Sequence, residues 1–230
     1  MGIEVKNIAA LEGHTGCIYA MDQGISTHTV FTGGGDKFIA LWNLKTLQAE
    51  KFAASLPSPV YAICHIPEKQ LLLAGTTKGS VLILDLDKKE EIKILQHHAA
   101  PIFDIKYSLK TNCFYTASGD GSFAVCSLDT LSMIKIKKLS KEKVRNIDFN
   151  YTTSEIAVAL GDHKVLVFDL QTLDHKKDFI AHQSAAYVVR YSPDGKFLLT
   201  GGKDAHLNVW KVGSYELVKS IPAHNWAIYD

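Results

Sequence analysis

Apolar and polar residues alternate along most of the chain with a spacing of two. Successive side chains of a β-strand point to opposite faces, so this spacing predicts strands rather than helices. Five segments show it most clearly: Ile39/Leu41, Val81/Ile83, Phe123/Val125, Val165/Val167 and Leu207/Val209. A second set of apolar runs precedes them, bounded by turn residues such as Ser192-Pro193-Asp194-Gly195. Since no long amphipathic helix is predicted, the pattern favours an all-β protein.

The pattern repeats with a period of 42 residues. Trp42 and Trp210 lie four periods apart, and the positions between them are the apolar residues Leu84, Cys126 and Phe168. Two further columns follow the same period, one of aspartate and one of histidine: Asp36, Asp120, Asp162 and Asp204, then His14, His98, His182 and His224. About four short strands in a period of this length are typical of a β-propeller blade.

The markers of each period resemble the Gly-His to Trp-Asp unit of WD-repeat proteins. Gly13-His14 begins the first unit and Trp42-Asn43 ends it, and the fifth unit has Ala181-His182 and Trp210-Lys211. The chain is therefore similar to WD-repeat β-propellers over residues 3 to 230. The resemblance implies one domain, 1-230, of four-stranded antiparallel blades, with repeats at approximately 13-54, 55-96, 97-138, 139-180 and 181-222.

Both ends of the chain are expected to be unfinished. Residues 3-12 resemble an outer strand without its inner neighbours, and residues 223-230 begin a sixth repeat. If the seven blades usual in the resembled family apply, the five repeats belong to a larger ring. Open strand edges would then favour association with another chain.

Histidine, threonine, aspartate and tryptophan recur together in a way that suggests a hydrolase at first sight. A catalytic set is needed once, however, whereas this set repeats. In the resembled family these positions form a hydrogen-bonded network within each blade. We therefore expect structural roles for His14, Thr32, Asp36 and Trp42, for His98, Thr116 and Asp120, and for His182, Thr200, Asp204 and Trp210.

Two units lack the complete set. The second has Leu56, Ala74, Lys78 and Leu84 at the four positions. Losing every partner together leaves no buried polar group unpaired, so this unit can fold without the network. The fourth unit keeps Asp162, which we expect to cap its turn alone.

A candidate binding site lies five residues after each histidine position. In the resembled family this column is on the upper rim of the central channel, and here it holds Tyr19, Tyr61, Phe103, Arg145, Tyr187 and Tyr229. The apolar spacing changes from two to three beside it, which predicts a β-bulge that turns a side chain outward. Aromatic residues and arginine are enriched at interface hot spots. The alternative is that these rings pack between blades as part of the core.

Basic residues add to this candidate site. Lys143 and Lys203 occupy two further columns that face the same rim in the resembled family, where most other positions hold small residues. The segment Lys135–Arg145 is also strongly basic. It is interpreted as a solvated, edge-protecting strand, and the alternative is a site for an acidic partner or RNA.

Composition excludes several classes of function. The 230 residues carry 25 basic and 24 acidic side chains and are 47% hydrophobic, as expected for a globular protein without a broad basic field for nucleic acid. No apolar run is long enough for a membrane helix, and no secretion signal is found. The sequence shows no metal, phosphate-binding or cofactor motif. The four widely spaced cysteines are expected to be free thiols: Cys17, Cys64, Cys113 and Cys126.

The sequence thus predicts a non-catalytic cytoplasmic scaffold whose upper face binds a protein or peptide segment. Binding of nucleic acid or a membrane is not expected. An enzyme that uses the central channel is the weaker alternative, because it would need a convergent polar cluster. The 42-residue columns show no such cluster.

Overall fold

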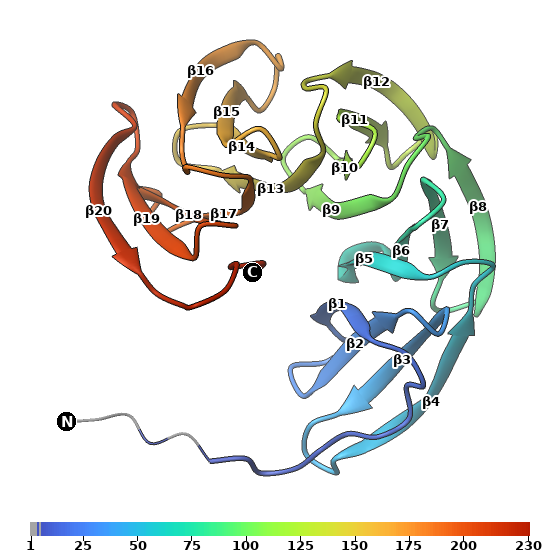
Figure 1. Cartoon of the computed structure of the whole chain (residues 1–230). Helices are drawn as coiled ribbons and strands as arrows, with labels where there is room; N and C mark the ends of the chain where they lie inside the picture. The colour runs from blue at the N-terminus through green and yellow to red at the C-terminus, as the bar shows by residue number, and fades with distance from the viewer. Residues whose placement is uncertain (1–3, 5) are drawn as a thin grey trace.

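The chain forms five four-stranded antiparallel sheets that follow one another around an arc (Figure 1). The structure, a computed structural model, describes residue 4 and residues 6–230. Apart from the sheets it contains one 3-10 turn, η1 (Pro67–Lys69). No helix in the described part of the chain is long and apolar enough to span a bilayer. The prediction of an all-β fold with four-stranded antiparallel blades is confirmed.

Each sheet uses four consecutive strands, the first innermost in the arc and the fourth outermost. The first two sheets contain β1 (Ile18–Gln23), β2 (Thr29–Gly34), β3 (Phe38–Asn43) and β4 (Gln48–Ser55), then β5 (Val60–Ile66), β6 (Leu71–Thr76), β7 (Ser80–Asp85) and β8 (Glu90–Gln96). The third contains β9 (Ile102–Ser108), β10 (Cys113–Ser118), β11 (Ser122–Ser127) and β12 (Ser132–Lys138). The last two contain β13 (Val144–Asn150), β14 (Glu155–Leu160), β15 (Lys164–Asp169) and β16 (His175–Ile180), then β17 (Ala186–Tyr191), β18 (Phe197–Gly202), β19 (His206–Lys211) and β20 (Glu216–Pro222).

The hydrophobic core lies between neighbouring sheets. Phe31 and Leu72, from the first and second sheets, are fully buried in one cluster, and Leu73 and Phe114 are buried together between the second and third. Gly33 has no room for a side chain, because a Cβ there would lie 2.7 Å from the Cδ1 of Ile63. Close approach of the sheets removes these apolar side chains from water, at about 1.5–3 kcal/mol for each large one.

A hydrogen-bonded chain of four side chains fixes the first and fifth sheets internally. His14 Nδ1 donates to Asp36 (2.8 Å), and Thr32 Oγ1 lies 2.7 Å from His14 Nε2 and accepts from Trp42 Nε1 at 2.6 Å. The fifth sheet repeats this arrangement with bonds of 2.9, 2.9 and 3.0 Å among His182, Thr200, Asp204 and Trp210. Within these two networks the histidine ring nitrogens, the threonine hydroxyls and the indole N–H all have partners, so these buried groups are satisfied.

The third sheet replaces the missing tryptophan with a second histidine. His98 contacts Asp120 (3.0 Å) and Thr116 (2.8 Å), as expected. His97 Nε2 lies 3.2 Å from Thr116 Oγ1 and 3.9 Å from the Sγ of Cys126, the residue at the tryptophan position. The imidazole of His97 therefore takes the place of the indole N–H. Burial lowers the pKa of His97 to about 4, which keeps the ring neutral.

The second and fourth sheets treat the four positions differently. Leu56 and Ala74 are buried in the second sheet, where they pack as apolar residues. In the fourth, Ser140 Oγ donates to Asp162 Oδ2 at 2.7 Å. The expectation that Asp162 acts alone was therefore wrong, because a serine at the histidine position is long enough to reach the carboxylate.

The two ends of the described chain carry no strand. Residues 6–12 bond to none of the five sheets, so the outer strand expected over 3-12 is not formed in its described part; residues 3 and 5 lie outside the description. A strand there has no neighbour to share its backbone hydrogen bonds. Residues 223-230 pack on the fifth sheet, where Ile228 N donates to Gly202 O at 3.0 Å.

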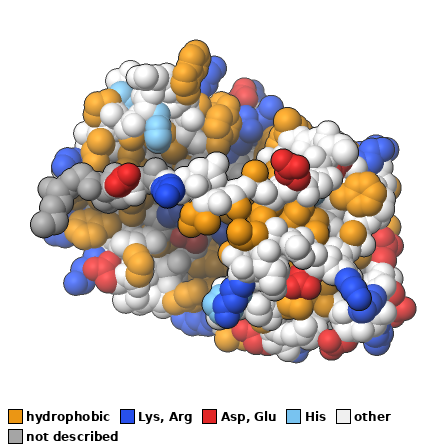
Figure 2. Space-filling view, turned by 90° about the horizontal axis from the view of Figure 1, so that it is seen from below, with side chains coloured by type: hydrophobic (Ala, Val, Ile, Leu, Met, Phe, Trp, Pro, Cys, Tyr) orange, Lys and Arg blue, Asp and Glu red, His pale blue; other side chains and the backbone are white. Residues whose placement is uncertain are grey.

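One face of the first sheet is left uncovered. Ile18, Met21 and Phe38 are 51%, 71% and 45% exposed, although the matching residues of later sheets, such as Val60 and Ile63, are buried against the preceding sheet. Figure 2 shows hydrophobic side chains gathered on the side of the molecule nearest this sheet. This patch is the largest difference in burial between the first sheet and the sheets that follow a neighbour.

The aspartate of the complete network is expected to be important for stability. Asp204→Ala leaves the buried His182 ring and the N–H of Gln183 without an acceptor, which should lower the free energy of unfolding by about 1–3 kcal/mol. Lys78→Ala, at the matching position of the second sheet, should change it little because Lys78 is exposed. Urea unfolding of both variants measures the difference. Equal losses would contradict a role for the network.

Stability should also depend on pH through His97. Its pKa is about 4 in the folded chain and near 6.5 when exposed, so the unfolded state binds more protons between these values. The contribution of neutral His97 is complete above pH 6.5 and decreases as the pH falls towards 4. His97→Gln should therefore lose less stability than the natural chain between pH 7 and 5, measured by urea unfolding. His175→Gln is the control at an exposed histidine and should leave the pH dependence of stability as in the natural chain. If both variants reduce this pH dependence equally, His97 is not its source.

Candidate functional site

The candidate site is built on a β-bulge in the first strand of each sheet. Strand pairing skips one residue at the same position every time, between Ile18 and Ala20 in β1 and at the equivalent points of β5, β9, β13 and β17. The bulge predicted from the sequence is thus present in all five sheets. The skipped residues are those of the aromatic column: Tyr19, Tyr61, Phe103, Arg145 and Tyr187.

These side chains form a continuous stacked arc together with Tyr229, which follows β20. We call the six residues the rim arc. Tyr19 meets Tyr61 edge-on with ring centroids 4.6 Å apart, and Tyr61 stacks on Phe103 at 6.0 Å. Tyr187 stacks on Tyr229 at 4.8 Å with 13° between the planes. With Ile18, the rim arc lines a cavity of about 580 Å³ at the mouth of the channel.

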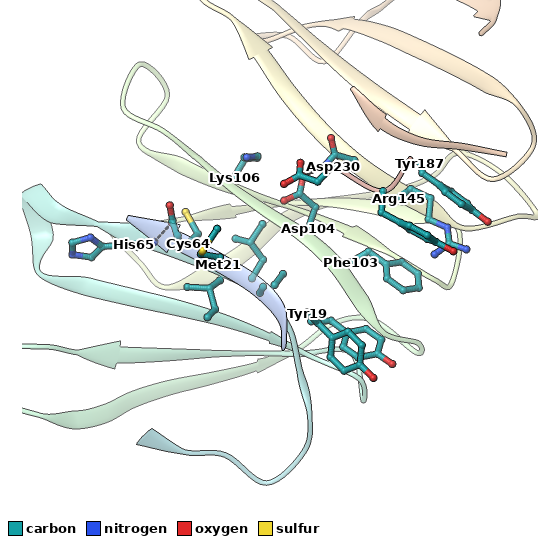
Figure 3. A pocket seen from close by; sticks show the side chains of 18 of the residues that line it. Tyr19, Met21, Cys64, His65, Phe103, Asp104, Lys106, Arg145, Tyr187 and Asp230 are labelled. Atoms are coloured by element: carbon teal, nitrogen blue, oxygen red, sulfur yellow. Dashed lines mark hydrogen bonds between the residues drawn. The ribbon is translucent and has the colours of Figure 1, made fainter. Parts of the chain in front are cut away.

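Arg145 joins the two aromatic halves of the rim arc. Its guanidinium carbon lies 4.6 Å from the centroid of Phe103 and 4.8 Å from that of Tyr187, so the cation is held between two ring faces (Figure 3). Such cation–π contacts stabilise the charge and fix the plane of the group. Tyr19 and Tyr229 at the ends are 51% and 70% exposed, and the inner members are half-buried.

The remaining predicted rim residues lie around the arc to different extents. Lys143 is exposed, and its Nζ lies 5.8 Å from the Phe103 centroid. Lys203 is also exposed but makes no ion pair or ring contact with any described residue. Gly119 lies close beside Phe103, where a Cβ would come within 3.1 Å of the ring. The structure therefore shows a contact with the arc for Lys143 and none for Lys203.

Below the rim arc the channel is lined with polar side chains that the sequence analysis missed. A second cavity of about 420 Å³ is bordered by charged side chains and one amide from four sheets and the C-terminal segment: Asp22, Asp104, Lys106, Asn146, Arg190 and Asp230. Figure 3 shows Asp104, Asp230 and Lys106 between the rim aromatics and the end marked by His65. The expectation that no polar cluster converges on the channel was wrong. The residue types differ from sheet to sheet, so a search for recurring types at the 42-residue period cannot detect them.

Many of these polar groups bind neighbouring sheets to one another. Asp104 Oδ2 accepts from Asn146 Nδ2 (2.7 Å) and from the N–H of Ile147 (2.8 Å). Asn146 Oδ1 in turn accepts from Val189 N (3.0 Å) and from Arg190, which pairs with Asp230. The innermost strands have backbone groups that face the channel instead of another strand, and these bonds satisfy some of them.

Similar bonds connect other pairs of sheets. Asp22 Oδ2 accepts from His65 N at 2.7 Å, and Asp148 Oδ2 accepts from Tyr191 N at 2.6 Å. In each case donor and acceptor are 43 residues apart, one more than the period. Burial raises the pKa of both Asp104 and Asp148, and the nearby positive charges of Lys106 and Arg190 oppose that rise. Their hydrogen bonds show that Asp22 and Asp148 accept from the backbone of the next sheet.

The polar groups that line the channel are largely engaged with one another. Asp104, Asn146, Arg190 and Asp230 are bound to one another or to the backbone, so none of them is aligned as a nucleophile with a free base. Within the described residues, no three His, Cys, Asp or Glu side chains are grouped to hold a metal ion. The rim arc is instead rich in aromatic surface, which suits a macromolecular partner.

The basic segment Lys135–Arg145 is partly occupied by structural contacts. Lys137 Nζ donates to Leu173 O at 3.1 Å and lies 4.9 Å from the centroid of Phe168. Lys138 donates to the carbonyl of Asp120. These two lysines thus serve the packing of their own and the adjacent sheet, and Arg145 belongs to the rim arc.

Comparison with known proteins gives matches of two kinds. Residues 5–43 and 173–211 match the sequence model of the WD40 family, described as WD domain, G-beta repeat. The chain is also similar to proteins named eukaryotic translation initiation factor 3 subunit I. It is 32% identical to that of Scheffersomyces stipitis over 91 residues, which cover 37% of this chain and 26% of the relative. It is 32% identical to that of Candida albicans over 101 residues, covering 42% and 28%. The matches thus span little more than a quarter of the relatives' length.

The polar bridge in the channel should contribute measurably to stability. Asn146→Ala leaves Val189 N–H without its side-chain acceptor and removes one donor from Asp104, at an expected cost of about 1–3 kcal/mol in the free energy of unfolding. Gln183→Ala is the control, because that side chain is exposed and makes no hydrogen bond with a described residue. Urea unfolding compares the two variants. A loss no greater for Asn146→Ala than for the control would show that the bridge is dispensable.

Proposed function

We propose that this chain, a WD-repeat protein, is a non-catalytic interaction scaffold that binds a peptide or protein segment at the rim arc. The family resemblance inferred from the sequence is confirmed by the two WD40 matches and by the five four-stranded sheets. A scaffold of this kind acts by presenting a fixed surface. The proposal therefore depends on whether the rim arc is suited to a partner.

The observation that carries the proposal is the continuity of the rim arc around the channel mouth. Four tyrosines, a phenylalanine and an arginine contact one another in sequence and border one cavity. The aromatic ends remain more than half exposed. Large amphipathic side chains that are already ordered lose little entropy on binding, which is why they dominate interface hot spots.

The similar proteins suggest the setting in which the scaffold works. The relatives are named as subunits of a translation initiation factor, so their names describe parts of an assembly. We extend this to the present chain as a proposal: it joins protein partners in translation initiation, in the cytoplasm. The repeat boundaries given above are likewise proposed as the structural repeats of this one domain.

A second surface suited to protein contact is the uncovered face of the first sheet. Met21, Phe38 and Ile18 expose apolar area there, whereas Val60 and Ile63, the equivalents of Ile18 and Met21 in the second sheet, are buried. We propose that another β-sheet packs on this face. The alternative of RNA or an acidic partner along Lys135–Arg145 has less support for the part that lies on the outer strand, because Lys137 and Lys138 are held in structural contacts there.

The test combines partner capture with measurements of stability. Tyr61→Ala and Tyr187→Ala should weaken binding of proteins captured from a lysate by about 2 kcal/mol, or roughly 30-fold, as for interface hot spots. Captured proteins are quantified at two salt concentrations. Affinities are then measured for those whose capture depends on the rim arc. Tyr151→Ala is the matched control, since Tyr151 is 51% exposed and lies outside the rim arc.

The same variants separate binding from packing. If the rings were core residues, each substitution would cost about 3–5 kcal/mol of stability, as other large core truncations do. Melting temperatures therefore accompany each affinity. A large loss of stability without a separate loss of partners would contradict the proposal, as would capture that is equally weakened by Tyr151→Ala.

A further inference from the structure

The central faces of the rim arc are already covered by its own members. Phe103 has Tyr61 stacked on it at 6.0 Å and the Arg145 guanidinium at 4.6 Å. Tyr187 lies between Arg145 at 4.8 Å and Tyr229 at 4.8 Å. A ligand therefore meets these rings at their edges, and ring edges carry partial positive charge.

The polar groups of the rim arc are mainly hydrogen-bond donors without partners. The hydroxyls of Tyr61, Tyr187 and Tyr229 make no hydrogen bond with any described residue. The Arg145 guanidinium forms no ion pair with the described carboxylates, and its Nε is buried without a hydrogen-bond partner. The terminal N–H groups of the guanidinium also make no hydrogen bond with a described residue, so they can donate to an acceptor of a ligand.

Positive charge at the rim arc is not compensated within the chain. Lys143, beside Phe103, has no carboxylate of the described residues within ion-pair distance. The acids that line the channel are engaged elsewhere, Asp104 by Asn146 and Asp230 by Arg190. The Arg145 guanidinium is held in a fixed plane between two rings. Its N–H groups can therefore donate two parallel hydrogen bonds to a planar carboxylate.

We infer that the rim arc binds an acidic polypeptide segment, one of whose carboxylates pairs with Arg145 while its backbone carbonyls accept from the tyrosine hydroxyls. This rests on the proposed function and specifies the chemistry of the partner at the same site. Lys143 adds a second positive charge at the edge of the cavity. The segment is thus recognised by hydrogen-bond donors and positive charge, while the edges of the aromatic rings line the cavity.

The same geometry disfavours single-stranded RNA at this site. Sequence-tolerant RNA binding depends on bases that stack on open aromatic faces. The faces of Phe103 and Tyr187 are occupied by their neighbours in the rim arc. An acidic peptide needs no free face, since its carboxylate and carbonyl groups approach the ring edges and the guanidinium.

Fluorescence anisotropy with synthetic probes tests this inference. The probes are a labelled twelve-residue peptide of alternating Glu and Ala, its Gln–Ala counterpart, and a twelve-nucleotide oligouridylate. We expect the Glu peptide to bind at least tenfold more tightly than the Gln peptide and the oligonucleotide. Arg145→Gln should weaken binding of the Glu peptide at least tenfold and that of the Gln peptide less than twofold.

Matched variants distinguish the carboxylate fork from general charge. Lys135→Gln removes one positive charge from an exposed position on β12 and should weaken binding less than twofold. Arg145→Lys keeps the charge but loses the planar fork, so its affinity should lie between those of the natural chain and Arg145→Gln. Melting temperatures show that each variant is folded, and Arg145→Lys serves as the readout if Arg145→Gln is unstable.

Three outcomes would overturn the inference. The first is that the Glu and Gln peptides bind with equal affinity, or that neither binds. The second is that Lys135→Gln and Arg145→Gln weaken binding of the Glu peptide equally. The third is that the oligonucleotide binds more tightly than the Glu peptide and that this binding depends on Arg145. The proposed function fails separately, when no captured protein depends on Tyr61 or Tyr187. If partners depend on these tyrosines but the Glu peptide does not bind preferentially, the scaffold function stands and the acidic specificity is wrong.

Discussion

The extra residue in the first strand of each sheet determines where the buried and the partner-facing side chains lie. In β5, for example, Val60 and Ile63 are three residues apart and both are buried against the first sheet. A regular strand would send them to opposite faces, because its side chains alternate. The bulge resolves this conflict and directs the intervening Tyr61 to the channel mouth. The packing of the sheets and the geometry of the rim arc therefore have one cause.

A second consequence of this arrangement is that the innermost strands need partners from outside their own sheet. The channel-facing N–H groups of these strands have no neighbouring strand on that side. Side chains such as Asp22, Asp104 and Asn146 accept hydrogen bonds from them. The bonds run from one sheet to the next, so they connect units that otherwise meet mainly through apolar contacts. They also leave the rim arc on a set of strands whose relative positions are fixed, as a preorganised binding surface requires.

The sequence predicted those features in which the same class of residue recurs every 42 residues. The 42-residue period identified the four-stranded sheets, the bulges and the column that holds Tyr19 and Arg145, because the same residue class appears at nearly every step. The channel network was missed since it joins unlike residues, such as Asn146 and Arg190, at offsets that vary from 40 to 44. The contact of Arg145 with two rings could not be predicted either, because it depends on rotamers rather than on spacing. A comparison of neighbouring columns for complementary pairs is the signal that could have found the network.

The histidine that replaces an indole in the third sheet makes two distant positions depend on each other. Cys126 is small, and His97 lies in the space beside it and bonds to Thr116 in the manner of the tryptophans elsewhere. A tryptophan at 126 would compete with His97 for the same volume, whereas a smaller residue at 97 alone would leave a hole beside Cys126. Evolution between the two arrangements must therefore pass through a poorly packed intermediate or change both residues together. The internal bonding of the third sheet is thus encoded by two residues together, and neither can be exchanged for its counterpart in the other repeats without the other.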